Sequence, residues 1–244
     1  MPEIVADDIS RAWLGALSLA DAQPRHEISN LVVHIQDIGR ATNIEIDGVR
    51  PRLDQELESA GCFSVSTVAS TIFPSSLWKQ GEPRERLFNR YRRLWPRIQA
   101  HKRNRRGTYF QRLIDLPGPS GPPFNQLEFV ISAYNSGVRR RSALQCGLLV
   151  PHLDSNATPY QGFPCMQQLA FIPEGKEGLR ISAFYPMHYL CARAYGNYLG
   201  LINLGRFVAS QIGRELSAMT CIALVAKVDQ RSLANAVLEA TSEV

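Results

Sequence analysis

The part of the chain that begins at residue 142 constrains the fold most, because strand-like and helix-like runs follow one another there with little sequence between them. Alternating or β-branched apolar runs predict strands at residues 142–150, 166–172, 178–185 and 220–228. A long apolar run at 198–216 predicts a helix between the last two strands. A glycine-containing turn joins the second run to the third, which indicates a hairpin. Such a mixture predicts an α+β protein.

The first half is less regular but carries recognisable helix signals. Apolar residues at helical spacing predict helices at 9–20, 83–99 and 124–134, and a proline start with a glycine stop predicts another at 51–60. Two strands are expected at 30–35 and 43–48, and a last helix at 231–239. The apolar segment 64–73 fits a strand or a buried helix equally well. The proline- and glycine-rich loop 116–123 is too short to separate domains, so residues 1–244 are expected to form one domain.

Composition excludes several classes of protein. With 244 residues, 45% of them hydrophobic, the chain can bury a substantial core, yet it has no apolar run of the ~20 residues that a membrane helix needs. The first residues are acidic where a secretory signal would be basic, so we expect a cytoplasmic protein. The five cysteines are scattered without CxxC spacing, which indicates neither a zinc site nor a disulfide framework.

The formal charge of +5 is unevenly distributed. Between Arg84 and Arg106 there are ten lysines and arginines and a single acid, Glu85. Such a segment fits a surface for phosphates, of a nucleotide or of nucleic acid. It also fits the solvated face of a helix, because the apolar residues within it recur at helical spacing. The second interpretation carries more weight.

Chemistry is indicated most clearly by Cys165 and by Asn197, which follows it 32 positions later. Cys165 lies in a Pro-Cys turn that runs into a predicted strand, and Asn197 lies where the long helix is expected to begin. A thiol acts as a nucleophile only as the thiolate, and so needs positive charge or helix dipoles nearby. An amide at a helix start can read the polar edge of a heterocyclic base.

Two further segments complete the pattern. Arg140 and Arg141 lie in an arginine triplet just before the strand that leads toward Cys165, and guanidinium groups bind phosphate bidentately. Taken alone, this triplet also fits an exposed turn. Tyr109 lies in the run Gly-Thr-Tyr, upstream of Asn-Gln-Leu at the start of a predicted helix. It is either a phenol in a proton path or a buried tyrosine with a satisfied hydroxyl.

In this order, Tyr109, the pair Arg140–Arg141, Cys165 and Asn197 resemble the thymidylate synthase and pyrimidine nucleotide hydroxymethylase family, over residues 106–226. The resemblance implies a large mixed sheet flanked by helices in a single domain, and a homodimer formed through the sheet. It implies that Cys165 adds to C6 of a pyrimidine nucleotide, whose C5 then takes a one-carbon unit from 5,10-methylenetetrahydrofolate. Tyr109 would serve the proton path, Asn197 would read the base, and Arg140 and Arg141 would hold the partner's phosphate.

The chain departs from the family pattern where phosphate and ribose are normally held. Residues 185–189 read Tyr-Pro-Met-His-Tyr and lack the arginine and aspartate that the family places there. His188 is a candidate replacement for a substrate contact or an acid–base group, because histidine titrates near neutrality. It also fits a packed side chain. Two functions stay open: an enzyme with altered substrate contacts, or a catalytically degenerate relative that binds a nucleotide or, less favoured, nucleic acid.

Overall fold

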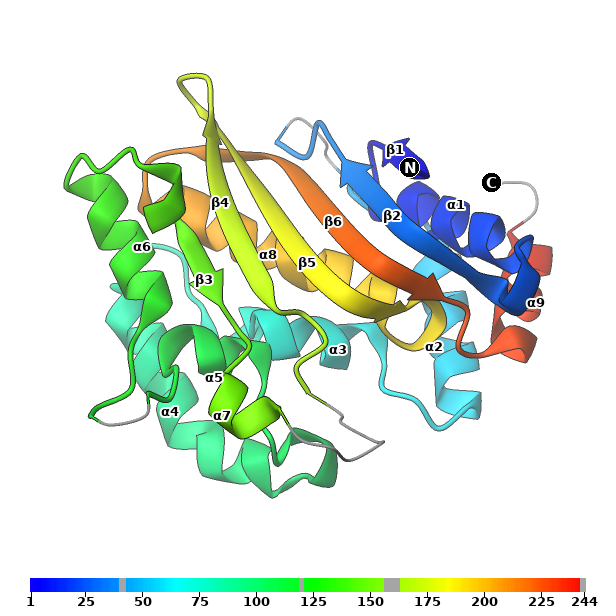
Figure 1. Cartoon of the computed structure of the whole chain (residues 1–244), viewed down its shortest axis with the longest axis horizontal. Coiled ribbons are helices and arrows are strands. Elements are labelled where there is room, and N and C mark those ends of the chain that lie inside the picture. The colour runs from blue at the N-terminus through cyan, green and yellow to red at the C-terminus, as the bar shows by residue number, and fades with distance from the viewer. Residues whose placement is uncertain (40–42, 119–120, 156–162, 242–244) are drawn as a thin grey trace.

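Six strands form one mixed sheet in the computed structural model of the chain, in the order β1-β2-β6-β5-β4-β3 (Figure 1). The structure describes residues 1–39, 43–118, 121–155 and 163–241. Strand β1 runs parallel to β2, and β5 runs parallel to β6, while the other neighbours are antiparallel. The strands are β1 (Glu3–Ala6), β2 (Glu27–Ile35), β3 (Gln145–Gly147), β4 (Gln168–Glu174), β5 (Gly178–Tyr189) and β6 (Glu215–Lys227).

Helices lie behind the sheet and at its two ends in the view of Figure 1. Their apolar faces join the inner face of the sheet in one hydrophobic core that reaches from the first helix to the last. None of the described helices is both long and apolar enough to cross a membrane. The helices are α1 (Ile9–Asp21), α2 (Val49–Ser59), α3 (Val65–Ile72), α4 (Arg84–Ala100), α5 (Tyr109–Ile114), α6 (Gln126–Asn135), α7 (Pro151–Asp154), α8 (Tyr195–Gln211) and α9 (Arg231–Ala240).

The expected mixed sheet flanked by helices is confirmed, and most predicted elements lie within a few residues of their observed positions. The open question at 64–73 is settled in favour of a helix, α3, whose first turn is capped by the Ser64 side chain. Strand 142–150 shortens to β3 because a 3₁₀ turn, Arg141–Ala143, precedes it. Helix α8 ends five residues before the predicted end, since Gly213 turns the chain with φ +67° into β6. Part of the loop 116–123 lies outside the described residues.

The strand expected at 43–48 is wrong. The backbone there bonds to the start of α1 instead of to a neighbouring strand: Ile44 accepts a hydrogen bond from Ile9 N–H, and Ile46 donates one to the Ser10 hydroxyl. Ile44 is buried, so the apolar spacing that suggested a strand reflects packing of an irregular segment. Gly48, at φ +89°, then turns the chain into α2.

Helices α3 and α8 approach each other closely because glycines face α3. A Cβ added at Gly196 would lie 2.6 Å from Val68 Cβ and 2.9 Å from the Val65 carbonyl oxygen. Gly196→Ala is therefore expected to reduce the free energy of unfolding by about 2–3 kcal/mol, because α8 must move away from α3. Chemical denaturation measures this change.

The matched control is Gly15→Ala in the middle of α1, where the added Cβ would be 3.4 Å from its nearest neighbour, Ile4 Cγ2. This substitution is expected to stabilise the protein by about 0.5–1 kcal/mol through helix propensity. Truncating Val68 to alanine should not rescue Gly196→Ala, because it removes Cγ1 but leaves the Val68 Cβ at 2.6 Å and the Val65 carbonyl oxygen at 2.9 Å. A neutral Gly196→Ala variant would contradict this account of the helix contact.

Candidate functional site

One cavity of about 330 Å³ joins residues that are far apart in the sequence. Its walls come from the loop before α3, the start of α5, the turn before β4, the end of β5 and the segment that leads into α8. The chemically distinctive residues on these walls are Phe63, Tyr109, Cys165, His188, Arg193 and Asn197. Four of the six predicted site residues, Tyr109, Cys165, His188 and Asn197, therefore meet here.

Strand register explains how Cys165 reaches this cavity. Strand β4 is antiparallel to β5, and Gln168 pairs with Phe184, so the turn before β4 lies beside the last residues of β5. The turn is held from the other side by Tyr109, whose hydroxyl accepts a hydrogen bond from Met166 N–H at 3.2 Å. Thr108 caps the helix that Tyr109 begins. Residue 162, part of the sequence motif around the cysteine, lies outside the described residues.

Asn197 is held by a buried histidine. Asn197 Nδ2 lies 3.0 Å from His188 Nε2, and His188 Nδ1 lies 3.7 Å from Cys221 Sγ. Burial lowers the pKa of His188 to about 3, so the ring is neutral at neutral pH. Since the amide Nδ2 can only donate, Nε2 accepts and Nδ1 carries the proton. Asn197 Oδ1 has no hydrogen-bond partner among the described residues, so it can accept a hydrogen bond from a ligand.

This geometry argues against one of the two roles considered for His188. A ring with a pKa of about 3 does not act as an acid–base group near neutrality. His188 does line the cavity, and its ring stacks on Tyr185 with centroids 4.3 Å apart. We therefore assign His188 to positioning Asn197. The histidine was recognisable in the sequence, but its burial was not.

The titratable groups of the cavity are tuned mainly by burial. Burial raises the pKa of Tyr109 well above its ordinary value, so its hydroxyl stays protonated. Burial also raises the pKa of the Cys165 thiol, and the positive charge of Arg193 opposes this effect. Cys165 is therefore a thiol at neutral pH, in a place where added positive charge would favour the thiolate.

Arg193 was not anticipated from the sequence. It lies in a π-helical turn, Leu190–Ala194, between β5 and α8. Trp13 Nε1 donates to the Leu190 carbonyl at 2.7 Å, and Asp229 Oδ1 accepts from Cys191 N–H at 2.9 Å. These contacts from α1 and from the loop before α9 fix the turn. The available signal was a single charged residue within residues 190–199. A π-helical turn of this kind often occurs at a functional site.

A buried ion pair supports the cavity wall and was also missed. Arg112 in α5 bonds to Asp154 in α7 through both terminal nitrogens, and both side chains are 3% exposed. The guanidinium carbon of Arg112 lies 4.7 Å from the ring centroid of Phe163, which lines the cavity. Burial would raise the pKa of Asp154, but hydrogen bonds from Arg112 and Val150 lower it below its ordinary value.

Arg140 and Arg141 lie outside the cavity. Both are exposed, and they begin the 3₁₀ turn before the edge strand β3. They are not among the described residues that line the cavity around Cys165. Within one chain they therefore take no part in the site, and their predicted role depends on a second copy of the chain.

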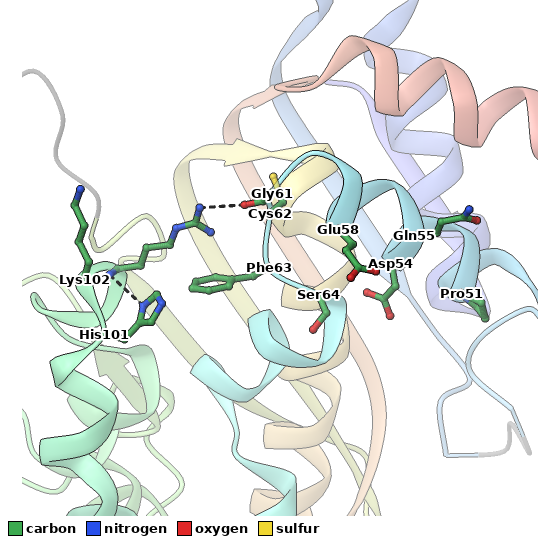
Figure 2. Close-up of a pocket in the computed structure, with 11 residues that line it drawn as sticks. Pro51, Asp54, Gln55, Glu58, Gly61, Cys62, Phe63, Ser64, His101 and Lys102 are labelled. Atoms are coloured by element: carbon green, nitrogen blue, oxygen red, sulfur yellow. Dashed lines mark hydrogen bonds between the residues drawn. The ribbon is translucent and has the colours of Figure 1, made fainter.

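A wider groove of about 990 Å³ adjoins the cavity, with Phe63 and Arg103 belonging to both. Figure 2 shows the Phe63 ring between the carboxylates of Asp54 and Glu58 on one side and His101 on the other. Arg103 Nη2 donates to the Gly61 carbonyl at 3.2 Å, which ties the basic turn Lys102–Asn104 to the end of α2. The site thus consists of a small inner cavity and a broad polar groove.

No protein-family model matches the sequence, and no curated protein is significantly similar to it.

Proposed function

We propose that the chain is a thymidylate synthase-like enzyme that transfers a one-carbon unit to C5 of a pyrimidine nucleotide through a Cys165 adduct at C6. The observation that carries this proposal is the single cavity shared by Tyr109, Cys165 and Asn197. These residues come from three separate segments and from three motifs that resemble one family in the same order. Residues that serve one reaction must meet in one place, so their shared cavity supports the proposal.

The proposed reaction begins at the thiolate of Cys165. Its sulfur forms a bond to C6, and the electrons of the C5–C6 double bond move toward the C4 carbonyl, which makes C5 nucleophilic. After C5 has gained the one-carbon unit it loses its proton, and the tetrahydrofolate amine would leave from that unit. Uptake of a hydride from the folate, giving a methyl group, or of hydroxide from water, giving a hydroxymethyl group, would then let the electrons return and break the C6–S bond. This is covalent catalysis, in which two easier steps replace one difficult substitution. Tyr109 stays protonated near Cys165, so it would serve the proton path through hydrogen bonds of its hydroxyl and would not take the proton itself.

Asn197 would recognise the base. Its Nδ2 is bound by His188, so its Oδ1 is the atom presented to a ligand. A carbonyl oxygen accepts from the N3–H of uracil or from the amino group of cytosine. Either contact helps to orient the ring for attack at C6, and the orientation depends on His188 staying neutral.

The resemblance implies methylenetetrahydrofolate, which would supply the one-carbon unit. The groove beside the cavity fits such a molecule in its chemistry. Phe63 offers a ring for the pterin to stack on, Glu58 can accept hydrogen bonds from its nitrogen donors, and Lys102 can bind its carboxylates. Phe63 belongs to both spaces, so a donor in the groove would lie next to a base in the cavity.

We further propose a homodimer formed through the open face of the sheet. In Figure 1 no helix of the described chain crosses the face of the sheet that points toward the viewer. Side chains on this face include Phe184 and Ile222, which are paired across β5 and β6, and Leu224, which is 42% exposed. Exposed apolar side chains on a sheet face normally pack against another layer. A second copy would cover it and bring its own Arg140 and Arg141.

Leu224→Glu tests the dimer. The added carboxylate would be buried without a partner in the interface, so we expect dimer affinity to fall about a hundredfold, with the monomer remaining folded. Sedimentation velocity measures this. The matched control is Phe129→Glu on α6, an aromatic side chain that is 46% exposed and does not lie on the sheet. Wild-type protein that sediments as a monomer at every concentration would contradict the dimer.

Tritium release from 5-tritiated dUMP, dCMP, UMP and CMP, with and without methylenetetrahydrofolate, tests the proposed reaction. Loss of the label requires addition at C6 and activation of C5, so it reports the chemistry whatever the product. Release from one nucleotide identifies the substrate. No release from any of them contradicts the proposed reaction.

The second candidate is a catalytically silent module that binds nucleic acid, and the outer face of α4 favours it. Arg86 and Arg93 make no ion pair in the described chain, and both line a groove on this helix together with Arg90 and Arg92. Their neighbours Arg90 and Arg92 are already paired with Glu82 and Asp115. Affinity for nucleic acid that falls steeply with salt would support this module.

A further inference from the structure

The charged groups that line the inner cavity are all positive. Two guanidinium groups, those of Arg103 and Arg193, lie on its walls, and no carboxylate does among the described residues. The other lining groups are neutral side chains: aromatic, aliphatic, hydroxyl, amide and thiol. A partly enclosed space with this lining attracts an anion, because few water molecules remain to screen the charges.

Arg193 has unused hydrogen-bonding capacity. Its side chain is half-buried, yet it makes no hydrogen bond or ion pair with the described residues. The nearby carboxylate of Asp229 accepts instead from the backbone N–H groups of Cys191 and Ala192. A guanidinium group has five donors, and those of Arg193 are therefore available to a molecule in the cavity. A ligand that accepts several hydrogen bonds would satisfy them.

Phe63 brings the second guanidinium to the same place. The guanidinium carbon of Arg103 lies 4.5 Å from the Phe63 ring centroid, and that of Arg193 lies 5.7 Å from the same centroid. Arg103 uses one nitrogen to bind the Gly61 carbonyl, which leaves its other donors available. Both guanidinium groups thus lie near one ring in the wall of one cavity, and guanidinium groups bind phosphate oxygens bidentately.

We infer that Arg103 and Arg193 form a clamp for the phosphate of a nucleoside monophosphate whose base enters the cavity beside Cys165. The volume of about 330 Å³ is at the small end of ligand pockets, which favours a single nucleotide over a polymer. The clamp lies within one chain and stands in for the arginine that residues 185–189 lack. The inference rests on the proposed function only for the nucleoside part of the ligand.

The first experiment needs no nucleotide. Iodoacetate and iodoacetamide alkylate the same thiolate but differ in charge, so the ratio of their rates at Cys165, followed by peptide mass spectrometry, reports the local field. We expect Arg193→Gln and Arg103→Gln each to lower the iodoacetate-to-iodoacetamide ratio about fivefold or more, the size of a screened charge interaction at short range. Arg193→Lys should keep most of the ratio.

Arg86→Gln is the matched control, because it removes one exposed positive charge on α4 outside the cavity. Its ratio should equal that of the wild type. An unchanged ratio in both clamp variants would overturn the inference, as would an equal fall in Arg86→Gln, which would show that only net charge matters.

The second experiment identifies the ligand. The concentrations of dUMP, dCMP, deoxyuridine and deoxycytidine that protect Cys165 from iodoacetamide are compared. We expect a monophosphate to protect at least tenfold better than its nucleoside, and this advantage to disappear in Arg193→Gln and Arg103→Gln but not in Arg86→Gln. A single-stranded oligonucleotide that protects better than any monophosphate would overturn the assignment to a single nucleotide.

The experiments distinguish a failure of the arginine clamp from a failure of the proposed reaction. Tritium release that depends on Cys165, with nucleotide affinity unchanged in the arginine variants, would overturn the clamp and leave the reaction standing. A phosphate-dependent protection that the arginine variants lose, without tritium release from any nucleotide, would support the clamp and overturn the reaction.

Discussion

Replacing Cys165 with alanine is expected to abolish tritium release, by more than about a thousandfold, while the protein stays folded. Removing a nucleophile takes away the covalent step itself, and losses of this size or more are usual for such residues. The substitution removes one half-buried sulfur atom at the edge of the cavity, so the packing loss is small. Nucleotide binding should persist, because Asn197 and the two arginines of the clamp are unchanged.

The same cysteine predicts the pH dependence of the wild type. Burial raises the pKa of the Cys165 thiol, so the reactive thiolate is a small fraction at neutral pH. Below the pKa this fraction grows tenfold for each pH unit, and the rate of alkylation or tritium release should therefore still be rising at about pH 9, beyond the pKa of an ordinary thiol. Arg193→Gln should move the whole profile to higher pH, because Arg193 lowers the pKa of this thiol.

Cys146→Ala is the control, since this thiol is buried in β3 and does not line the cavity. It should keep tritium release after correction for folded protein, measured by thermal melting. Release that survives in Cys165→Ala would exclude the covalent mechanism.

Periodicity was sufficient for elements whose neighbours are close in sequence. The hairpin of β4 and β5 and the helices α1, α2 and α4 lie close to their predicted positions, because apolar spacing and turn residues determine them locally. The segment 43–48 has the same apolar spacing as a strand, but its hydrogen bonds go to α1. Tertiary structure decides which segment a stretch of backbone forms hydrogen bonds with. A local sequence pattern does not determine this partner.

The candidate site could likewise be predicted only where its residues belong to local sequence motifs. Cys165, Tyr109 and Asn197 could be proposed from motifs, because each has a characteristic neighbour in the chain. Arg193 could not, since its importance comes from a π-helical turn held by Trp13 and Asp229, which are distant in sequence. The role of His188 likewise depends on burial, which lowers its pKa and turns a candidate acid–base group into a fixed acceptor for Asn197.

The buried Arg112–Asp154 pair is expected to contribute strongly to the stability of the fold. Arg112→Met is expected to reduce the free energy of unfolding by about 3–5 kcal/mol at neutral pH, because it leaves a buried carboxylate without its guanidinium. The loss is also expected to reach the site, since Arg112 packs on Phe163 in the cavity wall. Urea denaturation measures the first effect, and protection of Cys165 by nucleotide measures the second.

The pH dependence of stability distinguishes the loss of the charge interaction from the loss of packing in Arg112→Met. In the wild type the pKa of Asp154 is below its ordinary value, so the stability that this carboxylate contributes is present above about pH 4 and lost as the pH falls through the folded-state pKa. In Arg112→Met, burial without the guanidinium raises that pKa, and protonation relieves the penalty. The difference in free energy of unfolding between the wild type and Arg112→Met should therefore become smaller as the pH falls.

Arg92→Met is the control for a surface pair, because Arg92 is 40% exposed in its contact with Asp115. It should cost less than about 1 kcal/mol. The double variant Arg112→Met/Asp154→Leu should recover part of the lost stability, since it also removes the buried carboxylate that has lost its guanidinium. A double variant no more stable than Arg112→Met would show that the effect comes from lost packing on Phe163 and not from the buried charge.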